Sequence, residues 1–513
     1  MIKNPILKGF NPDPSIIRIG DDYYIATSTF EWWPGVQIHH SCDLVNWTLH
    51  SRPLNRVSQL DMTGIGDSCG IWAPCMTYDN GTVYLVYTVT RGNGVFFQTD
   101  NYLVTTNDIN GEWSEPVYLN SFGFDPSMFH DDDGRRWLLN LDNHYKKGQR
   151  FNGLWLQEYD EKEKKLLGKP VKIYENPATE LVEGSHIYKL NGYYYLLKAQ
   201  GGTGKKHSAQ LSRSESLFGP YEDCPHIVLH SRNDDSLPLQ KAGHADIVQT
   251  KSGEWYMVHL ASRMCPDADV SILGREGCIQ KVEWTEDGWL RLSQGGENPH
   301  VRVECDAPEE RTADSVFYDF KNGLPLDFQS LRVPIDDLLE FDENGLTMTG
   351  CEAPNSLYKQ SLIARRVDEH KANATTAVDF EPEWEKHMAG LICIYDTKNW
   401  YYLYITRNNN SGKKEINVIR SERGAVEIIT DKSLEIEEGK TIYLSAEING
   451  GEISFFAGYS ENEMEIVSEK LDLTILSDEK ANGFTGTMIG LCCQDLHLKS
   501  HKANFKYFRY GKL

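Results

Sequence analysis

A short hairpin pattern recurs five times in the first three hundred residues. Each copy is an apolar strand, a turn that contains glycine, and a second strand that opens with aromatic or β-branched residues, which is the signal of a tight β-hairpin. Because a repeat of this kind packs similar units around one core, it constrains the fold more than any single motif. The copies are 13-DPSIIRIGDDYYIA-26, 73-APCMTYDNGTVYLVY-87, 125-DPSMFHDDDGRRWLLNL-141, 183-EGSHIYKLNGYYYLLKA-199 and 244-HADIVQTKSGEWYMVHL-260.

The spacing of the copies predicts a β-propeller. Their first residues are numbers 13, 73, 125, 183 and 244, so the steps are 60, 52, 58 and 61 residues, which leaves room for four strands in each unit. Five radial blades of four strands account for the period, the turns and the near absence of helical periodicity. A Greek-key barrel is the alternative fold, and it does not explain the period.

The first residue of each copy is a candidate for a shared site. In a propeller the innermost strands line the central channel, so equivalent positions should meet there. A single acid at such a position is also consistent with a turn signal that accepts local backbone N–H bonds. Three acids in one register favour a functional site, with Trp72 just before the second position. We expect these equivalent positions to be Asp13, Ala73, Asp125, Glu183 and His244.

Converging carboxyl groups suit the hydrolysis of glycosidic bonds. One group must arrive protonated to assist the leaving group, while another stays ionised to activate water or to attack carbon. The charge of a third carboxylate can help the acid to hold its proton. Metal chelation is the rival interpretation, but the acids lie on separate blades and the chain has no D-x-D-x-D-G loop.

Composition limits the partners of the chain. A formal net charge of −23 over 513 residues disfavours nucleic acid, anionic membranes and polyanionic substrates, and leaves a small neutral oligosaccharide as the most open class. No apolar run is long enough to span a membrane, and MIKNPILKGF lacks a secretory core, so we expect a cytoplasmic protein. Eleven cysteines without a repeated spacing predict reduced thiols. Self-association is left open.

The adjacent histidines His39 and His40 follow the first hairpin. Such a pair suggests a ligand site, but side chains alternate along a strand and would point to opposite faces. We therefore interpret the pair as structural.

Several motifs resemble those of glycoside hydrolase family 43, in particular its β-xylosidase branch with a C-terminal β-sandwich. The resemblance runs over nearly the whole chain. The motifs are 11-NPDPS-15, 28-STFEWWPGVQIHHS-41, 71-IWAP-74, 122-FGFDPSMF-129, 182-VEGSHIYK-189, 242-AGHADIVQT-250, 274-GRE-276, 484-FTGTMIGLCCQD-495 and 504-NFKYFRY-510.

The resemblance implies an inverting exo-hydrolase that releases D-xylose from the non-reducing ends of β-1,4-xylo-oligosaccharides. In the family's pattern Asp13 is the general base that activates water, Asp125 tunes the pKa of the acid, and Glu183 is the general acid. An α-L-arabinofuranosidase, an arabinan-degrading hydrolase or a bifunctional enzyme on the same site is the alternative activity. A carbohydrate-binding propeller is the alternative without catalysis, and the three acids argue against it.

The resemblance also implies which residues bind the sugar. Arg275 matches an arginine placed against the sugar hydroxyls, and Phe30 and Trp72 match positions that line the same pocket. Phe484 matches a residue that the sandwich sends to the rim of the site. His244 matches a channel histidine that holds a calcium ion or a water in some members, so a Ca²⁺ ion at His244 is left open.

A second domain is expected after a change in composition. The segment 305-CDAPEERTAD-314 is polar, contains proline and is unlike a strand. We therefore expect an all-β chain made of a five-bladed β-propeller over 1–304 and a jelly-roll, concanavalin-like β-sandwich over 315–513. The sandwich is either a sugar-binding module or a packing partner of the propeller, and we favour the packing partner.

Overall fold

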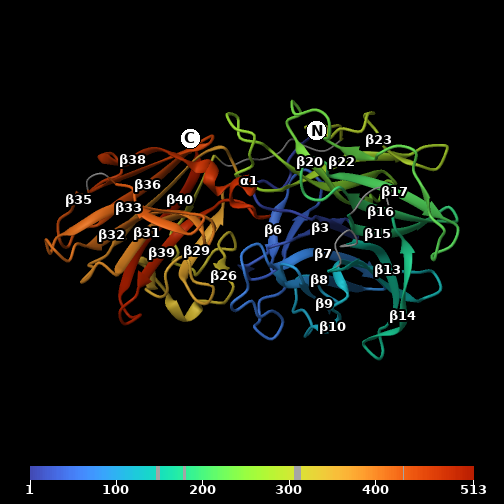
Figure 1. Ribbon diagram of the computed structural model, residues 1–513, viewed down its shortest axis with the longest axis horizontal. Coiled ribbons are helices and arrows are strands. Elements are labelled where there is room, and N and C mark those ends of the chain that lie inside the picture. The colour runs from blue at the N-terminus through green and yellow to red at the C-terminus, as the bar shows by residue number, and fades with distance from the viewer. Residues whose placement is uncertain (146–150, 177–180, 306–313, 431–432) are drawn as a thin grey trace.

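The computed structural model describes residues 1–145, 151–176, 181–305, 314–430 and 433–513. Figure 1 shows two β-sheet bodies side by side, the first from blue to yellow-green and the second from yellow to red. Within the described ranges the one α-helix is the single turn α1 (Asp478–Ala481), which confirms the predicted all-β class. The predicted boundary at 305–314 falls mostly on 306–313, outside the described residues.

The first body consists of five sheets of four or five strands. From the innermost strand outwards, the sheets contain β2 (Ser15–Ile19), β3 (Asp22–Thr27), β5 (Gln37–Ser41), β6 (Thr48–Ser51); β7 (Gly70–Asp79), β8 (Thr82–Asn93), β9 (Phe97–Thr106), β10 (Val117–Asn120); β11 (Gly123–His130), β12 (Arg136–Asn143), β13 (Phe151–Asp160), β14 (Lys165–Tyr174); β15 (Val182–Leu190), β16 (Tyr193–Gln200), β17 (Ser208–Ser214), β18 (Glu222–Asp223) with β19 (Leu229–His230); and β20 (Gln240–Gln249), β21 (Trp255–Ser262), β22 (Glu276–Trp284), β23 (Leu290–Leu292).

The innermost strands form a closed ring, which confirms the five-bladed propeller. Strand β2 contacts β7 and β20, while β11 contacts β7 and β15, and β15 contacts β20. The ring is fastened by the start of the chain, because β1 (Ile2–Lys3) pairs with β24 (Arg302–Val303). Asn4 adds a hydrogen bond from its side-chain amide to the carbonyl of Ile279 at 2.7 Å. The chain therefore reaches Asp13 directly from the seam that closes the propeller.

Each predicted turn joins an innermost strand to the second strand of its blade. At Asn80–Gly81 the φ angles are 48° and 85°, and at Asn191–Gly192 they are 51° and 84°. Two consecutive positive φ angles are typical of the type I′ turn that matches the twist of a hairpin. These turns fix one end of each innermost strand, so that the other end opens towards the channel.

The second body is a sandwich of two antiparallel sheets. One sheet contains β27 (Leu339–Asp342), β28 (Gly345–Thr349), β40 (Lys502–Lys512), β30 (Lys371–Asp379), β36 (Ile442–Asn449), β37 (Glu452–Gly458) and β38 (Met464–Asp472), with β25 (Ser315–Tyr318) beside β40. The other contains β29 (Ser361–Arg366), β39 (Met488–Asp495), β31 (His387–Asp396), β32 (Asn399–Arg407), β33 (Lys414–Glu422) and β34 (Ala425–Ile428), with β35 (Leu434–Glu435) beside β33. Short 3-10 turns occupy Asp336–Leu338 and Leu473–Leu476.

The sheet of β31 and β39 is covered on both faces. Both strands are buried along their whole length. One face packs into the sandwich core, and the other joins an apolar cluster that includes Phe10 and Trp32 of the propeller with Tyr402 and Met488 of the sandwich. Strand β4 (Trp32–Trp33) also pairs with β26 (Ser330–Leu331) across the boundary. This apolar interface supports the interpretation of the sandwich as a packing partner.

Two further expectations concern the cysteines and membranes. All eleven cysteines are free thiols, as the lack of a repeated spacing predicted. Over the described part of the chain, no helix has both the length and the apolar character needed to cross a bilayer.

Candidate active site

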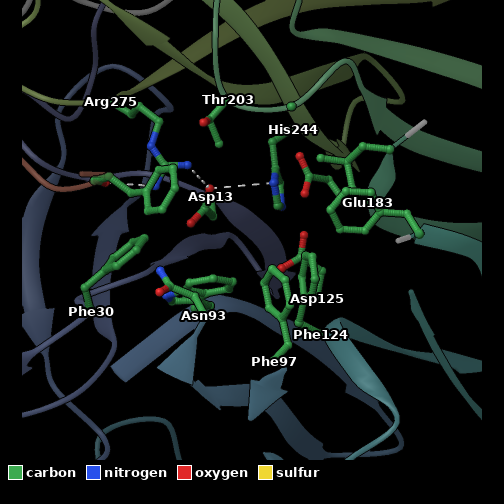
Figure 2. A pocket seen from close by; sticks show the side chains of 15 residues that line it. Asp13, Phe30, Asn93, Phe97, Phe124, Asp125, Glu183, Thr203, His244 and Arg275 are labelled. Atoms are coloured by element: carbon green, nitrogen blue, oxygen red, sulfur yellow. Dashed lines mark hydrogen bonds and ion pairs between the residues drawn. The ribbon is translucent and has the colours of Figure 1, made fainter. Parts of the chain in front are cut away.

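The innermost strands open onto a cavity of about 290 Å³. Figure 2 shows the carboxyl groups of Asp13, Asp125 and Glu183 around one space, with Arg275 and His244 beside Asp13. The cavity is thus formed by residues that are far apart in the sequence. All eight predicted site residues line it: Asp13, Phe30, Trp72, Asp125, Glu183, His244, Arg275 and Phe484. The remaining lining residues are Asn93, Phe97, Phe124, Phe151, Leu181, Gly202 and Thr203.

Strands β7, β11 and β15 each carry a β-bulge where they meet the cavity. Their regular pairing with the next strand is interrupted after Trp72, Phe124 and Glu183. The residue that follows each interruption has a positive φ angle, and Ala73, Asp125 and Gly184 hold these positions. Bulges of this kind redirect side chains and are frequent beside active sites.

The bulges correct the predicted register at one position. At the start of the five hairpin copies, the residues with positive φ are Asp13, Ala73, Asp125, Gly184 and His244. Glu183 lies one residue earlier and shares its register with Trp72 and Phe124, so it is not equivalent to Asp13. The prediction made Glu183 equivalent to Asp125 because both are acids that precede a serine by two positions. In the structure the left-handed conformation of Asp125 is shared by Gly184. Glu183 still reaches the same cavity from this neighbouring position.

Glycine is required at position 184. Its φ angle is +52°, and a Cβ added there would lie only 2.6 Å from the imidazole of His244. Other residues rarely adopt such a left-handed conformation. The backbone N–H of Gly184 donates to Oδ2 of Asp125 at 3.0 Å. The bulge of the fourth blade therefore orients Asp125 as well as Glu183.

Asp13 lies in a strongly polar environment. Nη1 of Arg275 donates to Asp13 Oδ1 at 2.8 Å, and the Ser28 hydroxyl donates to Oδ2 at 2.6 Å. Burial raises the pKa of Asp13, but the Arg275 guanidinium and these hydrogen bonds outweigh burial, so the net pKa is lowered. Asp13 is therefore ionised near neutral pH, as a general base must be.

Glu183 is shifted in the opposite direction. Burial and the negative charge of Asp13 raise the pKa of Glu183 to about 7. Burial and the charges of Glu183 and Asp13 also raise the pKa of Asp125 well above its usual value. Because the two neighbouring carboxyls titrate as a pair, they retain a proton near neutral pH. The cavity thus holds an ionised carboxylate and a protonated acid together.

Ser68 links the aromatic wall of the cavity to the sandwich. Its carbonyl accepts a hydrogen bond from Nε1 of Trp72 at 3.1 Å, and its hydroxyl accepts one from the N–H of Phe484 at 3.1 Å. The Ser68 N–H donates to Oε1 of buried Glu31 at 3.2 Å. Nη2 of Arg275 then donates to the carbonyl of Phe484 at 3.0 Å. The sandwich therefore helps to position both an aromatic side chain and the arginine.

A second polar network ties the blades together behind the carboxyls. Asp246 accepts hydrogen bonds from the Ser15 hydroxyl at 2.8 Å, from the Ile16 N–H at 2.9 Å and from the Tyr188 hydroxyl. The Ser15 hydroxyl in turn accepts from the N–H of Met76 at 3.0 Å. Blades one, two, four and five meet at this point, which fixes the strand that leads away from the first acid.

Sequence reasoning missed several of these groups. Ser68 and Thr203 lie outside the quoted motifs, and Ser28 opens one of them without any signal of its bond to Asp13; their roles arise from contacts between separate segments. Asp246 did carry a signal, because it stands two residues after a cavity position, as Ser15 does. A comparison of the five repeats two residues after their first position could have found Ser15 and Asp246.

His244 is neutral and offers few partners for a metal. Burial lowers its pKa to about 4, and Nδ1 lies 3.6 Å from Oδ1 of Asp13. Calcium prefers six to eight oxygen ligands, while the Asp13 oxygens already accept bonds from Arg275 and Ser28. In the part of the chain that the structure describes, Asp13 is the one carboxylate within ion-pair distance of His244.

Aromatic side chains dominate the rest of the cavity wall. The Trp72 ring lies 6.1 Å from Phe30, 5.5 Å from Phe124 and 6.3 Å from Phe484, measured between ring centroids. Such apolar walls with a few convergent polar groups are typical of small-molecule sites. Together, the propeller, the three carboxyls and the aromatic wall provide the groups that hydrolysis of a glycosidic bond requires.

Comparison with known proteins identifies the family. The profile of "Glycosyl hydrolases family 43" matches residues 2–290, and that of "Beta xylosidase C-terminal Concanavalin A-like domain" matches residues 318–511. The chain therefore belongs to glycosyl hydrolase family 43, in its branch with a C-terminal sandwich.

Individual relatives cover nearly the whole chain. Xylosidase/arabinosidase 43B of Humicola insolens is 44% identical over 525 residues, which covers 99% of this chain and 97% of that protein. Beta-xylosidase of Bacillus subtilis (strain 168) is 43% identical over 532 residues and 99% of both chains. The crystal structure of xylan beta-1,4-xylosidase from Bacillus halodurans C-125 has a TM-score of 0.96 at 45% identity and covers 100% of both chains.

Proposed function

We propose that the chain is an exo-acting β-D-xylosidase that removes D-xylose from the non-reducing ends of β-1,4-xylo-oligosaccharides with inversion. The observation that carries this proposal is that Asp13, bonded to Arg275, and Glu183 line one cavity, where the pKa of Asp13 is lowered and that of Glu183 is raised to about 7. Full-length similarity to proteins named as β-xylosidases supports the choice of sugar.

The base step begins at Asp13. Its carboxylate takes a proton from a water molecule, and the oxygen of that water attacks the anomeric carbon of the terminal xylose. Arg275 keeps Asp13 ionised and presents its guanidinium to the cavity, where it can bind a sugar hydroxyl. An inverting enzyme leaves room for this water by holding its two carboxyls about 6.5–9.5 Å apart.

The acid step takes place at Glu183. Its carboxyl proton passes to the glycosidic oxygen as the bond from that oxygen to the anomeric carbon breaks, so the leaving sugar departs as an alcohol. The charges of Asp125 and Glu183 influence each other, so that the pKa of Asp125 is raised as well. The Gly184 N–H donates a hydrogen bond to Asp125 and orients it. Deprotonation of Asp13 by solvent and reprotonation of Glu183 restore the starting state.

The size and shape of the cavity favour a short substrate. A volume of about 290 Å³ lies at the lower end of ligand sites, which are roughly 300–1,000 Å³. Phe484 enters from the sandwich and borders the cavity, so a long polymer has less room than a chain end. This arrangement supports exo-action on oligosaccharides.

A panel of substrates tests the proposal. Purified protein should release xylose one unit at a time from xylobiose and xylotriose, and should cleave nitrophenyl β-D-xyloside faster than nitrophenyl α-L-arabinofuranoside. Faster cleavage of the arabinoside would favour the arabinofuranosidase alternative, which the name of the Humicola insolens relative also motivates. Absence of turnover on every substrate would favour the sugar-binding alternative.

Calcium and cell location are also matters for proposal. We expect catalysis without a tightly held calcium ion, because among the described residues Asp13 is the one carboxylate within ion-pair distance of His244 and calcium prefers six to eight oxygen ligands; rates measured with and without a chelator test this expectation. Eleven free cysteines support a reducing, cytoplasmic location. Sedimentation analysis would establish whether the chain self-associates.

A further inference from the structure

A second cluster of chemically reactive side chains lies on the first blade, away from the cavity. Asp22 opens β3, His40 lies in β5, and Cys42 directly follows β5. His40 Nε2 is 2.8 Å from Asp22 Oδ1, and Cys42 Sγ is 3.3 Å from the same oxygen. Cys42 Sγ and His40 Nε2 are 3.8 Å apart. In the described ranges this is the one place where three such donor atoms all lie within 4.8 Å of one another.

The β-ladder holds these donors together. Strands β3 and β5 are antiparallel, with Tyr23 opposite Ser41 and Tyr24 opposite His40. Because side chains alternate along a strand, His40 and Cys42 project from the same face of the sheet. Asp22 and Cys42 directly follow the last pair of this ladder, Tyr23 and Ser41, one on each strand. The alternation expected for His39 and His40 is borne out, since His39 is buried and His40 is partly exposed.

The donor spacing fits a tetrahedral ion. Zinc binds thiolate, imidazole and carboxylate at about 2.0–2.3 Å, which places ligand atoms roughly 3.3–3.6 Å apart. The two distances from Cys42 Sγ already lie close to this range. The contact between His40 and Asp22 would lengthen by roughly half an ångström as the ion replaces the proton that they share. Three protein ligands leave the fourth position to water.

The chemistry of the donors selects the kind of ion. A thiolate and an imidazole favour zinc and other thiophilic cations, whereas calcium and magnesium prefer oxygen. The cluster can also be reached from solvent, because Cys42 is exposed and the Asp22 and His40 side chains are 43% and 27% exposed. Asp43 directly follows Cys42 in the sequence, and its charge favours a cation.

We propose that Asp22, His40 and Cys42 form a binding site for a thiophilic divalent cation, zinc in particular, at the turn end of the first blade. Binding releases the thiol proton of Cys42 to solvent, moves the proton of neutral His40 from Nε2 to Nδ1, and forms bonds from the ion to sulfur, Nε2 and the carboxylate oxygen. The five residues of β2 separate this site from the cavity by roughly 17 Å at about 3.3 Å per residue. The ion would crosslink the two middle strands of the blade and shield Cys42.

Titration of the metal-free full-length protein tests this site. Calorimetry with Zn²⁺ should give one site that depends on Cys42, and Co²⁺ should give a thiolate charge-transfer band. Loss of an outer partner weakens metal sites about 10–100-fold, so Cys42→Ser and His40→Gln should weaken Zn²⁺ binding by about a hundredfold or more. Zn²⁺ should also slow the alkylation of Cys42 in the wild-type protein.

A matched control is available on the fourth blade. Cys224 Sγ lies 3.1 Å from Nδ1 of His226, and no third donor completes a group there among the residues described. Cys224→Ser should therefore leave the Zn²⁺ affinity and the cobalt band unchanged. Equal Zn²⁺ binding by wild type and Cys42→Ser, or a cobalt spectrum without a thiolate band, would overturn the proposal. Hydrolysis of xylobiose should be the same in Cys42→Ser and wild type, because the site is remote from the cavity.

Discussion

Asp13 and Glu183 are two buried carboxyls in one cavity, and their surroundings give them opposite properties. They are 5% and 7% exposed. Asp13 receives hydrogen bonds from Arg275 and Ser28, whereas in the described structure no hydrogen bond reaches the Glu183 carboxyl. The pKa of Asp13 is lowered and that of Glu183 is raised to about 7. Equal burial thus produces a base or an acid according to the neighbouring charges.

The comparison teaches that the role of each carboxyl is set by residues from other segments. Arg275 is 262 positions from Asp13 in the sequence, and the carbonyl that orients this arginine belongs to Phe484 of the sandwich. The sandwich therefore contributes to the charge state of the base without touching it. Each of the following experiments removes one part of this difference.

Removal of the acid should have the largest and most selective effect. Glu183→Ala should lower kcat/KM on xylobiose by about 10²–10⁴-fold, because general acid catalysis contributes that much. A nitrophenyl xyloside should lose much less, since its leaving group departs without a proton. Steady-state kinetics on both substrates provide the measurement. Equal losses on the two substrates would contradict the acid role, and the exposed Glu222→Ala should change neither.

Removal of the base should have an equally large but unselective effect. Asp13→Asn keeps the size of the side chain but cannot accept a proton from water, so kcat/KM should fall by about 10²–10⁴-fold on both substrates. Asparagine should also retain the fold, which circular dichroism can verify. An Asp13→Asn enzyme that still cleaves nitrophenyl xyloside at the wild-type rate would exclude Asp13 as the base.

Removal of the positive charge of Arg275 should bring the pKa values of Asp13 and Glu183 closer together. Arg275→Met takes away the charge that lowers the pKa of Asp13, so that pKa should rise and the acid limb of the kcat/KM profile should move to higher pH. The loss at the optimum should be about tenfold to a hundredfold, because positioning of the sugar also suffers. In the wild type the alkaline limb should fall as pH rises through about 7, where Glu183 loses its proton.

Two outcomes would be informative for this variant. An unchanged acid limb in Arg275→Met would show that Arg275 does not control the base. Arg420→Met provides a control on the sandwich. Arg420 of β33 forms an ion pair with Glu427 of the neighbouring strand β34, and neither residue lines the cavity. Its pH profile should match that of the wild type.

Loosening of the sandwich contact should have the smallest effect. Ser68→Ala removes one hydrogen bond to the Phe484 N–H, and a typical bond of about 1 kcal/mol corresponds to about fivefold. KM for xylobiose should rise by about fivefold with little change in kcat, because substrate positioning and not proton transfer is affected. A loss of kcat as large as that of Glu183→Ala would contradict this view of Ser68.

Much of the fold could be predicted because it is repeated locally. Asn80–Gly81 and Asn191–Gly192 encode hairpin turns with a few residues each, and five such hairpins imply the propeller. Eight residues of the cavity could also be predicted, since the motifs that contain them carry a family resemblance. The sandwich could be predicted from strand patterns, although its role in the cavity depended on the resemblance at Phe484.

The remaining features depend on three-dimensional contacts that no local pattern encodes. The predicted register of Glu183 is wrong because residue type made it equivalent to Asp13 and Asp125. The residue equivalent to them in backbone conformation is Gly184, which has the positive φ angle. Ser68 and Phe484 are 416 positions apart in the sequence, and no local pattern around either residue predicts their hydrogen bond. The cluster of His40 with Asp22 and Cys42 also has no local signal, because the pairing of two strands brings Asp22 to the other two residues.

The stereochemistry of the released sugar tests the central claim most directly. If Asp13 activates water while Glu183 protonates the leaving oxygen, water attacks from the side opposite the leaving group and the configuration inverts. Proton NMR of freshly cleaved xylobiose, recorded before mutarotation, should therefore show α-xylose as the first product from the non-reducing unit. Initial release of β-xylose would contradict the account. Retention of configuration requires a carboxylate, in place of water, to attack the anomeric carbon first.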